Sequence, residues 1–428
     1  MTPTTINRVH GRRVFDSRGR PTVEAEVRLA SGVIGRGIAP AGASRGSREA
    51  VDLRDGGTRL GGYDVATALA NVRGPLARAI FGMDALDQAN IDARLIAVDG
   101  TPNKSNMGGN AIVAISLAVA QAAATAHDMP LWMYLAGDDP VSLPLPEIQI
   151  FGGGAHAGRR IDIQDLMVMP VGAWTFDDAI TMVAEIYRAA GTLMQEAGKL
   201  AGVADEGGYW PMFASNEEAL EMTVRAIERA GCHPGGDAAI SLDIAASEFG
   251  RDGRYTLALD KQELDRDGMS EMLMRWLDKY PIVSIEDPFA EDDRVAWIEF
   301  NRAAGHRVQI IGDDYLTTSA LRVAEAKQDD ACNAVLIKVN QAGTLTEAKA
   351  ALDAGKAAGF GTIVSARSGE SEDVAIAHLA VGWNAGQLKV GSFARGERMA
   401  KWNEVLRIEE ALGQGAKFAG AGALARRK

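Results

Sequence analysis

Reactive side chains recur at the ends of six apolar segments in the second half of the chain. The segments end at Asp243, Glu286, Asp313, Lys338, Ala366 and Lys389. From Glu286 onward these positions lie 23 to 28 residues apart, which suits one strand, one helix and two loops per step. If the strands run parallel, three carboxylates and two amines meet at one end of a sheet.

The three acids predict a metal site. Asp243, Glu286 and Asp313 would repel one another in a partly dry place unless a cation neutralised them. Ligands that offer only oxygen suit Mg²⁺, with water or substrate completing an octahedron. A single acid after a strand is more often a helix N-cap or part of a surface ion pair. The prediction therefore depends on acids at successive strand ends.

The two lysines predict a base. Lys338 closes the apolar segment in LIKVNQ, and Lys389 closes the one in QLKVGS. A lysine beside a metal and a second lysine should have a lowered pKa, because nearby positive charge disfavours its ammonium form. The alternative is that both lysines only balance the charge of the acids.

Two further groups lie in glycine-rich segments. Glu206 lies in VADEGGYWP, where the glycines let the backbone approach a ligand and the acid can give a proton to a leaving group. The same segment is also an ordinary turn. His156 lies in FGGGAHAGRR, and a lone loop histidine is more often structural than catalytic. This glycine run lacks the strand, helix and spacing of a dinucleotide-binding fingerprint.

A base, an acid and Mg²⁺ that face one another indicate one class of reaction. The base removes the proton next to a carboxylate, the metal stabilises the resulting enediolate, and a β-hydroxyl group is lost. Without that electrostatic help the carbon acid is too weak, so the metal acts chiefly on the transition state.

The elements that must position these groups favour two domains. The alternating segments PTVEAEVRL and VIGRGIA are separated by Ser31 and Gly32 and predict a hairpin, and the apolar segment 110–127 predicts a buried helix. We place the boundary at the proline-rich DDPVSLPLPEIQ, giving an N-terminal α+β capping domain, 1–137, and a closed β/α barrel, 138–428. The long gap after Asp243 contains FGRDGRYTLAL, which predicts an extra hairpin.

Composition limits the partners. A net charge of −12 and a pI near 5.1 argue against nucleic acid or an anionic membrane as partner, so an anionic substrate needs a local cationic pocket. Cys232 and Cys332 are too few for a disulfide framework or a thiolate metal site, which suits a reducing cytoplasm. The N-terminus lacks an apolar signal segment, and we expect no membrane span.

Several motifs resemble the enolase (phosphopyruvate hydratase) family over almost the full length of the chain. They are FDSRGRPTVEAEV, AGASRGSREAVDLRDGG, NKSNMGGNAI, HAGRRIDIQDLMVMP, DEGGYWP, SIEDPFAEDD, GDDYLTT, LIKVNQAGTLTEA and SARSGESED. The resemblance implies an N-terminal α+β domain, an eight-fold β/α barrel of TIM type, and a homodimer or larger homo-oligomer.

Carried over motif by motif, the resemblance implies a role for each candidate residue. Two Mg²⁺ ions are expected per site; the residues for the metal are Asp243, Glu286 and Asp313, with Ser44 on a mobile loop that brings the second ion. The catalytic residues are Lys338 as base, Glu206 as acid and Lys389 as a contact of the substrate carboxylate. Those that bind or line the substrate site are Arg367 and Ser368 at the phosphoryl group, with His156, Gln164 and Asp165.

The chain departs from the family pattern near one end of the ligand. Ala366 stands where the family has histidine, Asp165 where it has glutamate, and Gly152 where asparagine is common. Arg45 follows Ser44, and Arg159 lies in the altered HAGRR segment. Less bulk and more guanidinium groups would suit a larger, more anionic ligand.

Three functions remain open at this point. The departures favour a specialised lyase of phosphonate biosynthesis, similar to carboxyphosphonoenolpyruvate synthase, with Ala366, Arg45 and Arg159 contacting the extra group of a carboxyphosphono derivative of 2-phosphoglycerate. The second is an ordinary glycolytic enolase, which converts 2-phosphoglycerate into phosphoenolpyruvate. The third is a non-catalytic interaction protein on the same scaffold, which would have no need for the full set of acids and lysines.

Overall fold

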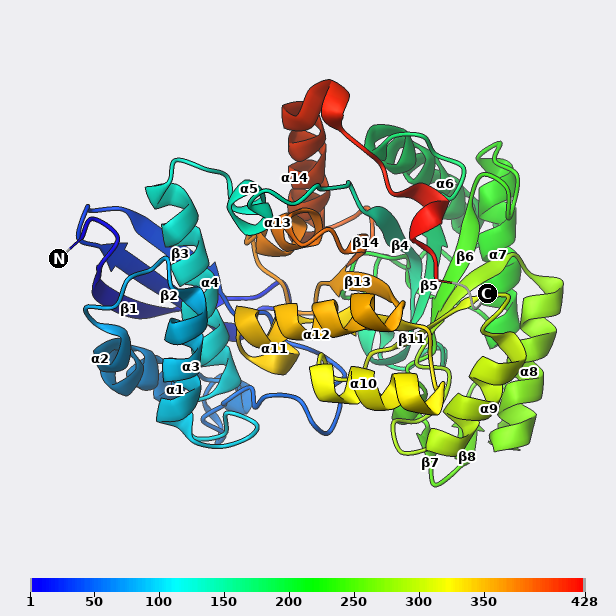
Figure 1. The fold of residues 1–428 in the computed structure, drawn as a ribbon. Helices are drawn as coiled ribbons and strands as arrows, with labels where there is room; N and C mark the ends of the chain where they lie inside the picture. Colours follow the sequence, from blue (N-terminus) through cyan, green and yellow to red (C-terminus); the bar gives the residue numbers. More distant parts are fainter. Residues whose placement is uncertain (1, 426–428) are drawn as a thin grey trace.

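The computed structural model describes residues 2–425. An N-terminal part of helices packed on a small sheet lies beside a closed barrel of eight strands with helices around it (Figure 1). The expected fold class, an α+β part followed by a TIM-type barrel, is confirmed.

The N-terminal sheet forms as the alternating sequence predicts. It contains β1 (Ile6–Phe15), β2 (Pro21–Leu29) and β3 (Ile34–Ile38) in the order β1-β2-β3, all antiparallel. The hairpin across Ser31 and Gly32 is confirmed. The smaller helices of this part are α1 (Ala66–Asn71), α2 (Ala77–Ile80), α3 (Gln88–Asp99) and α5 (Leu131–Ala136).

Helix α4 (Gly109–Ala126) packs closely on β3. A Cβ atom on Gly35 would lie 2.1 Å from the carbonyl oxygen of Ala118, and one on Gly37 would lie 2.5 Å from Cβ of Leu117. Glycine is required at both positions because the helix backbone passes so near the strand.

By length and composition α4 could also cross a membrane, contrary to our expectation that no segment would. Its mean hydropathy over 18 residues is 1.5, and 83% of that window is buried inside the fold. The helix is apolar on all sides because sheet and helices cover it, as in the core of a globular protein. A buried helix at 110–127 was the prediction, and it is confirmed.

The barrel contains every strand predicted from the apolar segments. Its strands are β4 (Leu145–Gly152), β5 (Asp165–Met169), β6 (Ala239–Asp243), β10 (Ile282–Glu286), β11 (Gln309–Gly312), β12 (Ala334–Ile337), β13 (Gly361–Ser365) and β14 (Gly386–Gly391). The order around the barrel is β10-β11-β12-β13-β14-β4-β5-β6, closed by pairing of β6 with β10.

Strand β5 runs antiparallel to both of its neighbours, which an all-parallel barrel does not provide for. The segment between β4 and β5 contains only a single 3₁₀ turn, Gly154–Ala157. A parallel return needs a crossover of a dozen or more residues, usually a helix, so this short loop brings the chain back in the opposite direction.

Helices cover the outside of the barrel (Figure 1). They are α6 (Phe176–Glu196), α7 (Asn216–Arg229), α8 (Arg266–Lys279), α9 (Arg294–Ala304), α10 (Ala320–Asp329), α11 (Val339–Ala342), α12 (Leu345–Ala358), α13 (Ala375–Gly382) and α14 (Gly396–Leu412). A side-chain oxygen caps the start of most of the long ones, at Thr175, Ser215, Asp265, Asp293, Ser319 and Thr344.

The long gap after β6 holds a second small sheet. Its strands are β7 (Gly250–Arg251), β8 (Arg254–Leu257) and β9 (Gln262–Asp265), all antiparallel. The extra hairpin predicted from FGRDGRYTLAL is thus confirmed.

The register of the barrel strands brings reactive positions to one level. Asp243 is the register partner of Glu286 on one side and of Asp165 on the other. Lys389 is the partner of Ser365, the last residue of β13. The strand ends therefore form one mouth, as the spacing predicts.

Candidate active site

Lys389 lies among three carboxylates at the barrel mouth. Its Nζ is 2.7 Å from Oδ2 of Asp243, 2.7 Å from Oε2 of Glu286 and 3.5 Å from Oδ2 of Asp165. Burial lowers the pKa of Lys389, but the three acids raise it more, and the net shift is well upward. In this arrangement the three acids therefore favour the ammonium form of Lys389.

Lys338 pairs with Asp313. Its Nζ donates a hydrogen bond to Oδ2 of Asp313, and Nε2 of Gln341 donates to the other oxygen at 2.8 Å. Burial lowers the pKa of Lys338, whereas Asp313 and Glu286 raise it, so the net shift is upward. Without a metal ion, the acids near Lys338 outweigh the effect of burial and of the neighbouring cations; the lowering expected beside a metal stays a prediction.

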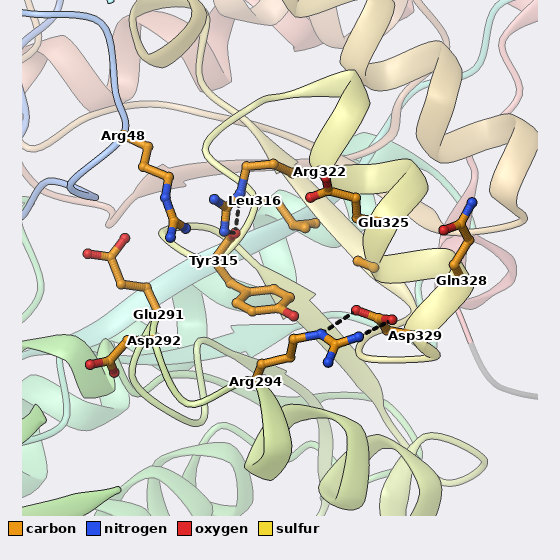
Figure 2. A pocket seen from close by; sticks show the side chains of 11 residues that line it. Arg48, Glu291, Asp292, Arg294, Tyr315, Leu316, Arg322, Glu325, Gln328 and Asp329 are labelled. Atoms are coloured by element: carbon orange, nitrogen blue, oxygen red, sulfur yellow. Dashed lines mark hydrogen bonds and ion pairs between the residues drawn. The ribbon is translucent and has the colours of Figure 1, made fainter. Parts of the chain in front are cut away.

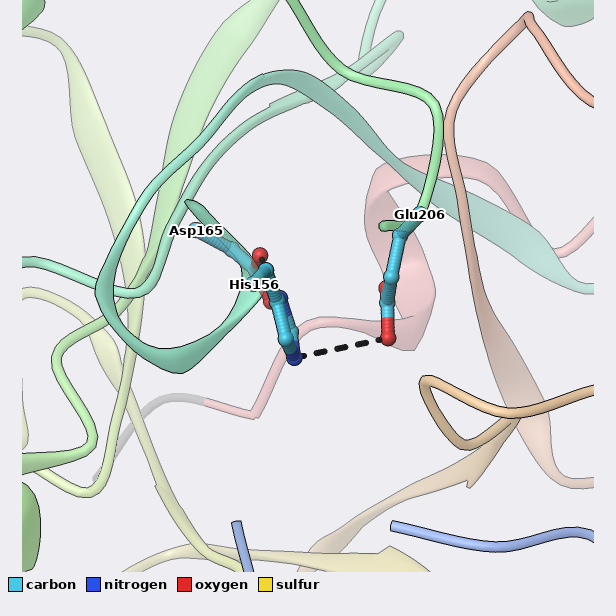
Figure 3. Close-up of side chains that lie close together, drawn as sticks. All are labelled: His156, Asp165 and Glu206. Atoms are coloured by element: carbon cyan, nitrogen blue, oxygen red, sulfur yellow. Dashed lines mark hydrogen bonds and ion pairs between the residues drawn. The ribbon is translucent and has the colours of Figure 1, made fainter. Parts of the chain in front are cut away.

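His156 is held on both sides by polar groups (Figure 3). Its Nδ1 is 3.0 Å from Oδ1 of Asp165, and its Nε2 is 3.0 Å from Oγ of Ser368 and 3.6 Å from Oε1 of Glu206. Burial lowers the pKa of His156, but Glu206 and Asp165 raise it to about 9. The ring is thus an imidazolium that donates from both nitrogens and ties Glu206 to the cluster.

Arg367 connects the barrel to the loop that carries Ser44. Its Nη1 is 2.9 Å from Oε2 of Glu49 and 3.1 Å from Oδ1 of Asn340, and its Nη2 donates to the carbonyl oxygen of Ser44 at 2.9 Å. A Cβ on Gly42 would lie 2.0 Å from this Nη2, so the glycine lets the loop approach the guanidinium. Burial lowers the pKa of Arg367, and Glu49 raises it more.

A small cavity of about 20 Å³ lies between these groups. It is lined by Ser44, His156, Gln164, Asp165, Glu206, Asp243, Lys338, Ser365, Ala366, Arg367, Ser368, Lys389 and Val390. Most of the residues proposed from the sequence are thus brought together around one small space. The two remaining acids, Glu286 and Asp313, contact the lysines that line it.

The two arginines proposed as substrate contacts lie elsewhere in the described part of the chain. Arg45 is exposed on the loop after Ser44. The side chain of Arg159 is 70% exposed and pairs with Glu248 at 2.7 Å. Neither lines the cavity, whereas Ala366 does and is 6% exposed.

Sequence reasoning did not single out Glu49, Asn340 or Gln341. Each bonds a residue of the site, although Glu49 and Arg367 are 318 positions apart in the chain. Asn340 and Gln341 follow Lys338 almost directly, so their position after a strand end was an available signal. Glu49 gave none, because its contact depends on how the N-terminal loop folds over the barrel.

The acids offer oxygen ligands for a cation. Oε1 of Glu286 and Oε1 of Gln164 are buried without a hydrogen-bond partner among the described residues. Buried oxygens left unpaired are costly, and a hard cation such as Mg²⁺ would satisfy them. The donor set therefore fits Mg²⁺.

The three predicted metal ligands are not gathered round one point within residues 2–425. Two groups there have ligand atoms within 4.8 Å of one another: Asp287, Asp313 and Asp314, and His156, Asp165 and Glu206. Asp287 accepts the backbone N–H groups of Asp313 and Asp314 at 2.9 and 2.8 Å, which gives it a structural task. In contrast, Lys389 stands between Asp243 and Glu286.

The side chains around the cavity suit a small molecule that carries two anionic groups. Lys338, Lys389 and Arg367 supply positive charge on its walls, and Glu206 and Lys338 supply groups that transfer protons. Removal of a proton and protonation of a leaving group can therefore occur within one enclosed space.

Comparison with known proteins gives matches along nearly all of the chain. Residues 6–135 match the family model described as Enolase, N-terminal domain, and residues 140–427 match Enolase, C-terminal TIM barrel domain. A relative named Enolase 1, from Desulfitobacterium hafniense (strain Y51), is 49% identical over 423 residues, which cover 98% of this chain and 97% of that protein.

Proposed function

The chain belongs to the enolase family of hydro-lyases, and from that premise we propose that it converts 2-phosphoglycerate into phosphoenolpyruvate with Mg²⁺. The observation that carries the proposal is the single cavity that Lys338, Glu206 and Arg367 all line. The near full-length relative named Enolase 1 supports this substrate over the carboxyphosphono derivative. A homodimer and a cytoplasmic location stay predictions.

The proposed reaction begins at Lys338. This amine takes the proton from the carbon next to the substrate carboxylate, while Lys389 binds the carboxylate and Arg367 and Ser368 bind the phosphoryl group. Lys338 must be neutral to act as a base, so its ion pair with Asp313 has to weaken when metal and substrate are bound. Glu206 must carry a proton for the next step, in which it gives that proton to the departing hydroxyl group, which leaves as water.

Mg²⁺ held by Asp243, Glu286 and Asp313 would stabilise the negative charge that develops on the substrate carboxylate. The chain's own residues supply everything else in this scheme. The imidazolium of His156 lies 3.6 Å from Glu206 and helps to fix its position.

A second candidate is the carboxyphosphono derivative of 2-phosphoglycerate. One observation favours it: Ala366 lines the cavity directly before Arg367 and Ser368, and its small side chain leaves room at the proposed phosphoryl site. Since Arg45 and Arg159 do not reach the cavity, the added positive charge that this substrate would require is not provided there.

The test is direct. Purified protein with Mg²⁺ is given 2-phosphoglycerate, and phosphoenolpyruvate is followed by its absorbance, with the carboxyphosphono analogue in parallel. Turnover of 2-phosphoglycerate is the expected result, and Lys338→Ala should reduce it at least about 100-fold while Mg²⁺ still binds. Turnover of the analogue alone would favour the second candidate, and no turnover of either would favour a binding protein.

A further inference from the structure

The loop of residues 41–50, here called the Ser44 loop, crosses the mouth of the barrel and is fastened at both ends. Ala41 exchanges two backbone hydrogen bonds with Gly369, at 2.9 and 2.8 Å. At the other end, the N–H of Ala50 donates to the carbonyl oxygen of Gln341 at 2.8 Å. The segment between these points contains Ser44, which lines the cavity.

In the middle of the Ser44 loop, Arg367 binds the carbonyl oxygen of Ser44, and an acid of the barrel, Glu291, binds Ser47. The backbone N–H of Ser47 lies 3.3 and 3.2 Å from the two carboxylate oxygens of Glu291. Glu291 belongs to the segment that follows β10, the strand that ends at Glu286. Figure 2 shows Glu291 at the edge of an open cleft beside this loop, with Arg48 nearby. An N–H bonded to a charged carboxylate is held more strongly than one bonded to a neutral acceptor.

Glu291 is itself fixed by the loops of other strands. Its backbone N–H donates to Oγ of Ser247 at 2.9 Å, and Ser247 lies in the turn after β6, the strand of Asp243. The next residue, Glu248, pairs with Arg159 at 2.7 Å, on the loop that carries His156. Contacts therefore run from the Ser44 loop through Glu291 to the loops of two further site residues.

We propose that Glu291 is a positioning residue that holds the Ser44 loop closed over the cavity and, through Ser247, joins this closure to the loops after β6 and β4. Glu291 does not line the cavity, so it acts on the closed fraction of the loop rather than on the substrate. The proposal deepens the proposed function. It also gives Arg159 a role outside the substrate site, although this exposed pair with Glu248 contributes little by itself.

The first experiment measures the loop without any substrate. Glu291→Ala and Glu291→Gln are compared with the matched control Asp292→Asn, which changes the same charge at the next position. Amide hydrogen exchange of peptides covering 41–50 should be about fivefold faster in Glu291→Ala, less so in Glu291→Gln, and unchanged in the control. If amide hydrogen exchange of the Ser44 loop is as slow in Glu291→Ala as in wild type, the proposal is overturned.

The second experiment measures kinetics with 2-phosphoglycerate. Glu291→Ala should raise KM about fivefold with kcat within about twofold, because substrate must supply the closing free energy that Glu291 supplied. Asp292→Asn should leave both unchanged, and a common melting temperature shows that all variants fold. Unchanged KM in Glu291→Ala would count against the proposal.

The two arms also separate this proposal from the proposed function. If wild-type protein does not convert 2-phosphoglycerate, the proposed function fails, while hydrogen exchange still decides whether Glu291 holds the loop. Ser247→Ala removes the hydroxyl group that accepts from the backbone N–H of Glu291 but leaves the Glu291 carboxylate in place. It should make Glu291 more mobile and speed amide hydrogen exchange in the Ser44 loop. No change in that variant would show that Ser247 has no part in the closure.

Discussion

Nζ of Lys389 lies 2.7 Å from one carboxylate oxygen of Glu286, and the other oxygen of Glu286 is buried without a hydrogen-bond partner among the described residues. The pair crosses the barrel mouth between β10 and β14, which are not adjacent strands, and its residues lie 103 positions apart in the chain. One oxygen of Glu286 thus pairs with the ammonium group of Lys389, and the other is free to bind a metal ion.

Glu286→Gln should weaken Mg²⁺ binding by about 10- to 100-fold, because the substitution removes a charged oxygen ligand. The melting temperature without metal should change little, since Lys389 keeps Asp243 and Asp165 as partners. Calorimetric titration with Mg²⁺ and thermal unfolding in a chelator measure the two effects. Unchanged Mg²⁺ affinity would remove Glu286 from the proposed ligands, and Asp292→Asn serves as the control for loss of one negative charge.

His156→Gln should cost stability in a way that depends on pH. The pKa of His156 is raised to about 9 from its ordinary 6.5, against burial, by Glu206 and Asp165. A raised pKa means that the contribution is fully present below pH 6.5 and is lost as the pH rises through about 9, with an upper limit of about 3 kcal/mol.

Urea unfolding of wild type and His156→Gln in a chelator, between about pH 6 and pH 9.5, measures this difference. The gap in unfolding free energy should be widest at the acid end and narrow at the alkaline end. A gap that stays constant across the range would show that His156 is neutral throughout, and the cluster with Glu206 would need another explanation.

Gly35→Ala should destabilise the N-terminal part by about 1–3 kcal/mol or more, because the added Cβ would lie 2.1 Å from a backbone oxygen of α4. The atoms nearest to this Cβ are backbone atoms of Ala118 and Ala122, so no flexible side chain can move aside. Gly74→Ala is the matched control, since the nearest atom to its Cβ would be the flexible end of Arg78 at 3.9 Å. Equal unfolding free energies for the two variants would contradict the close packing of α4 on β3.

The repeated strand ends could be predicted from the sequence because each buried strand is continuously apolar and stops at a polar residue. The reversed direction of β5 could not, since an apolar run such as DLMVM does not tell which way a strand points. The one available sign of this reversal was that the segment before Asp165 is too short for a crossover helix.

Within the site, the meeting of Lys389 with Asp243 and Glu286 follows from strand ends alone. The pKa of Lys338 did not follow, because its direction depends on how many acids surround the amine once the loops have folded. The position of Arg159 could not be predicted for a related reason. Its motif suggested a contact with the ligand, but its guanidinium pairs with Glu248, an acid on another loop.

Ala366→His tests whether this position reads the size of the substrate. The residue is 6% exposed and lines the cavity directly before Arg367, so an imidazole there fills space next to the proposed phosphoryl site. We expect activity on 2-phosphoglycerate to be kept or improved, because the smaller phosphoryl group still fits and gains a hydrogen-bond donor. Any activity on the carboxyphosphono analogue should fall at least about tenfold, since its extra carboxylate would collide with the ring.

The ratio of kcat/KM for the two substrates, compared between wild type and Ala366→His, measures this change in specificity. An unchanged ratio would mean that Ala366 does not determine specificity, and selection would then have to come from the residues that bind the carboxylate end.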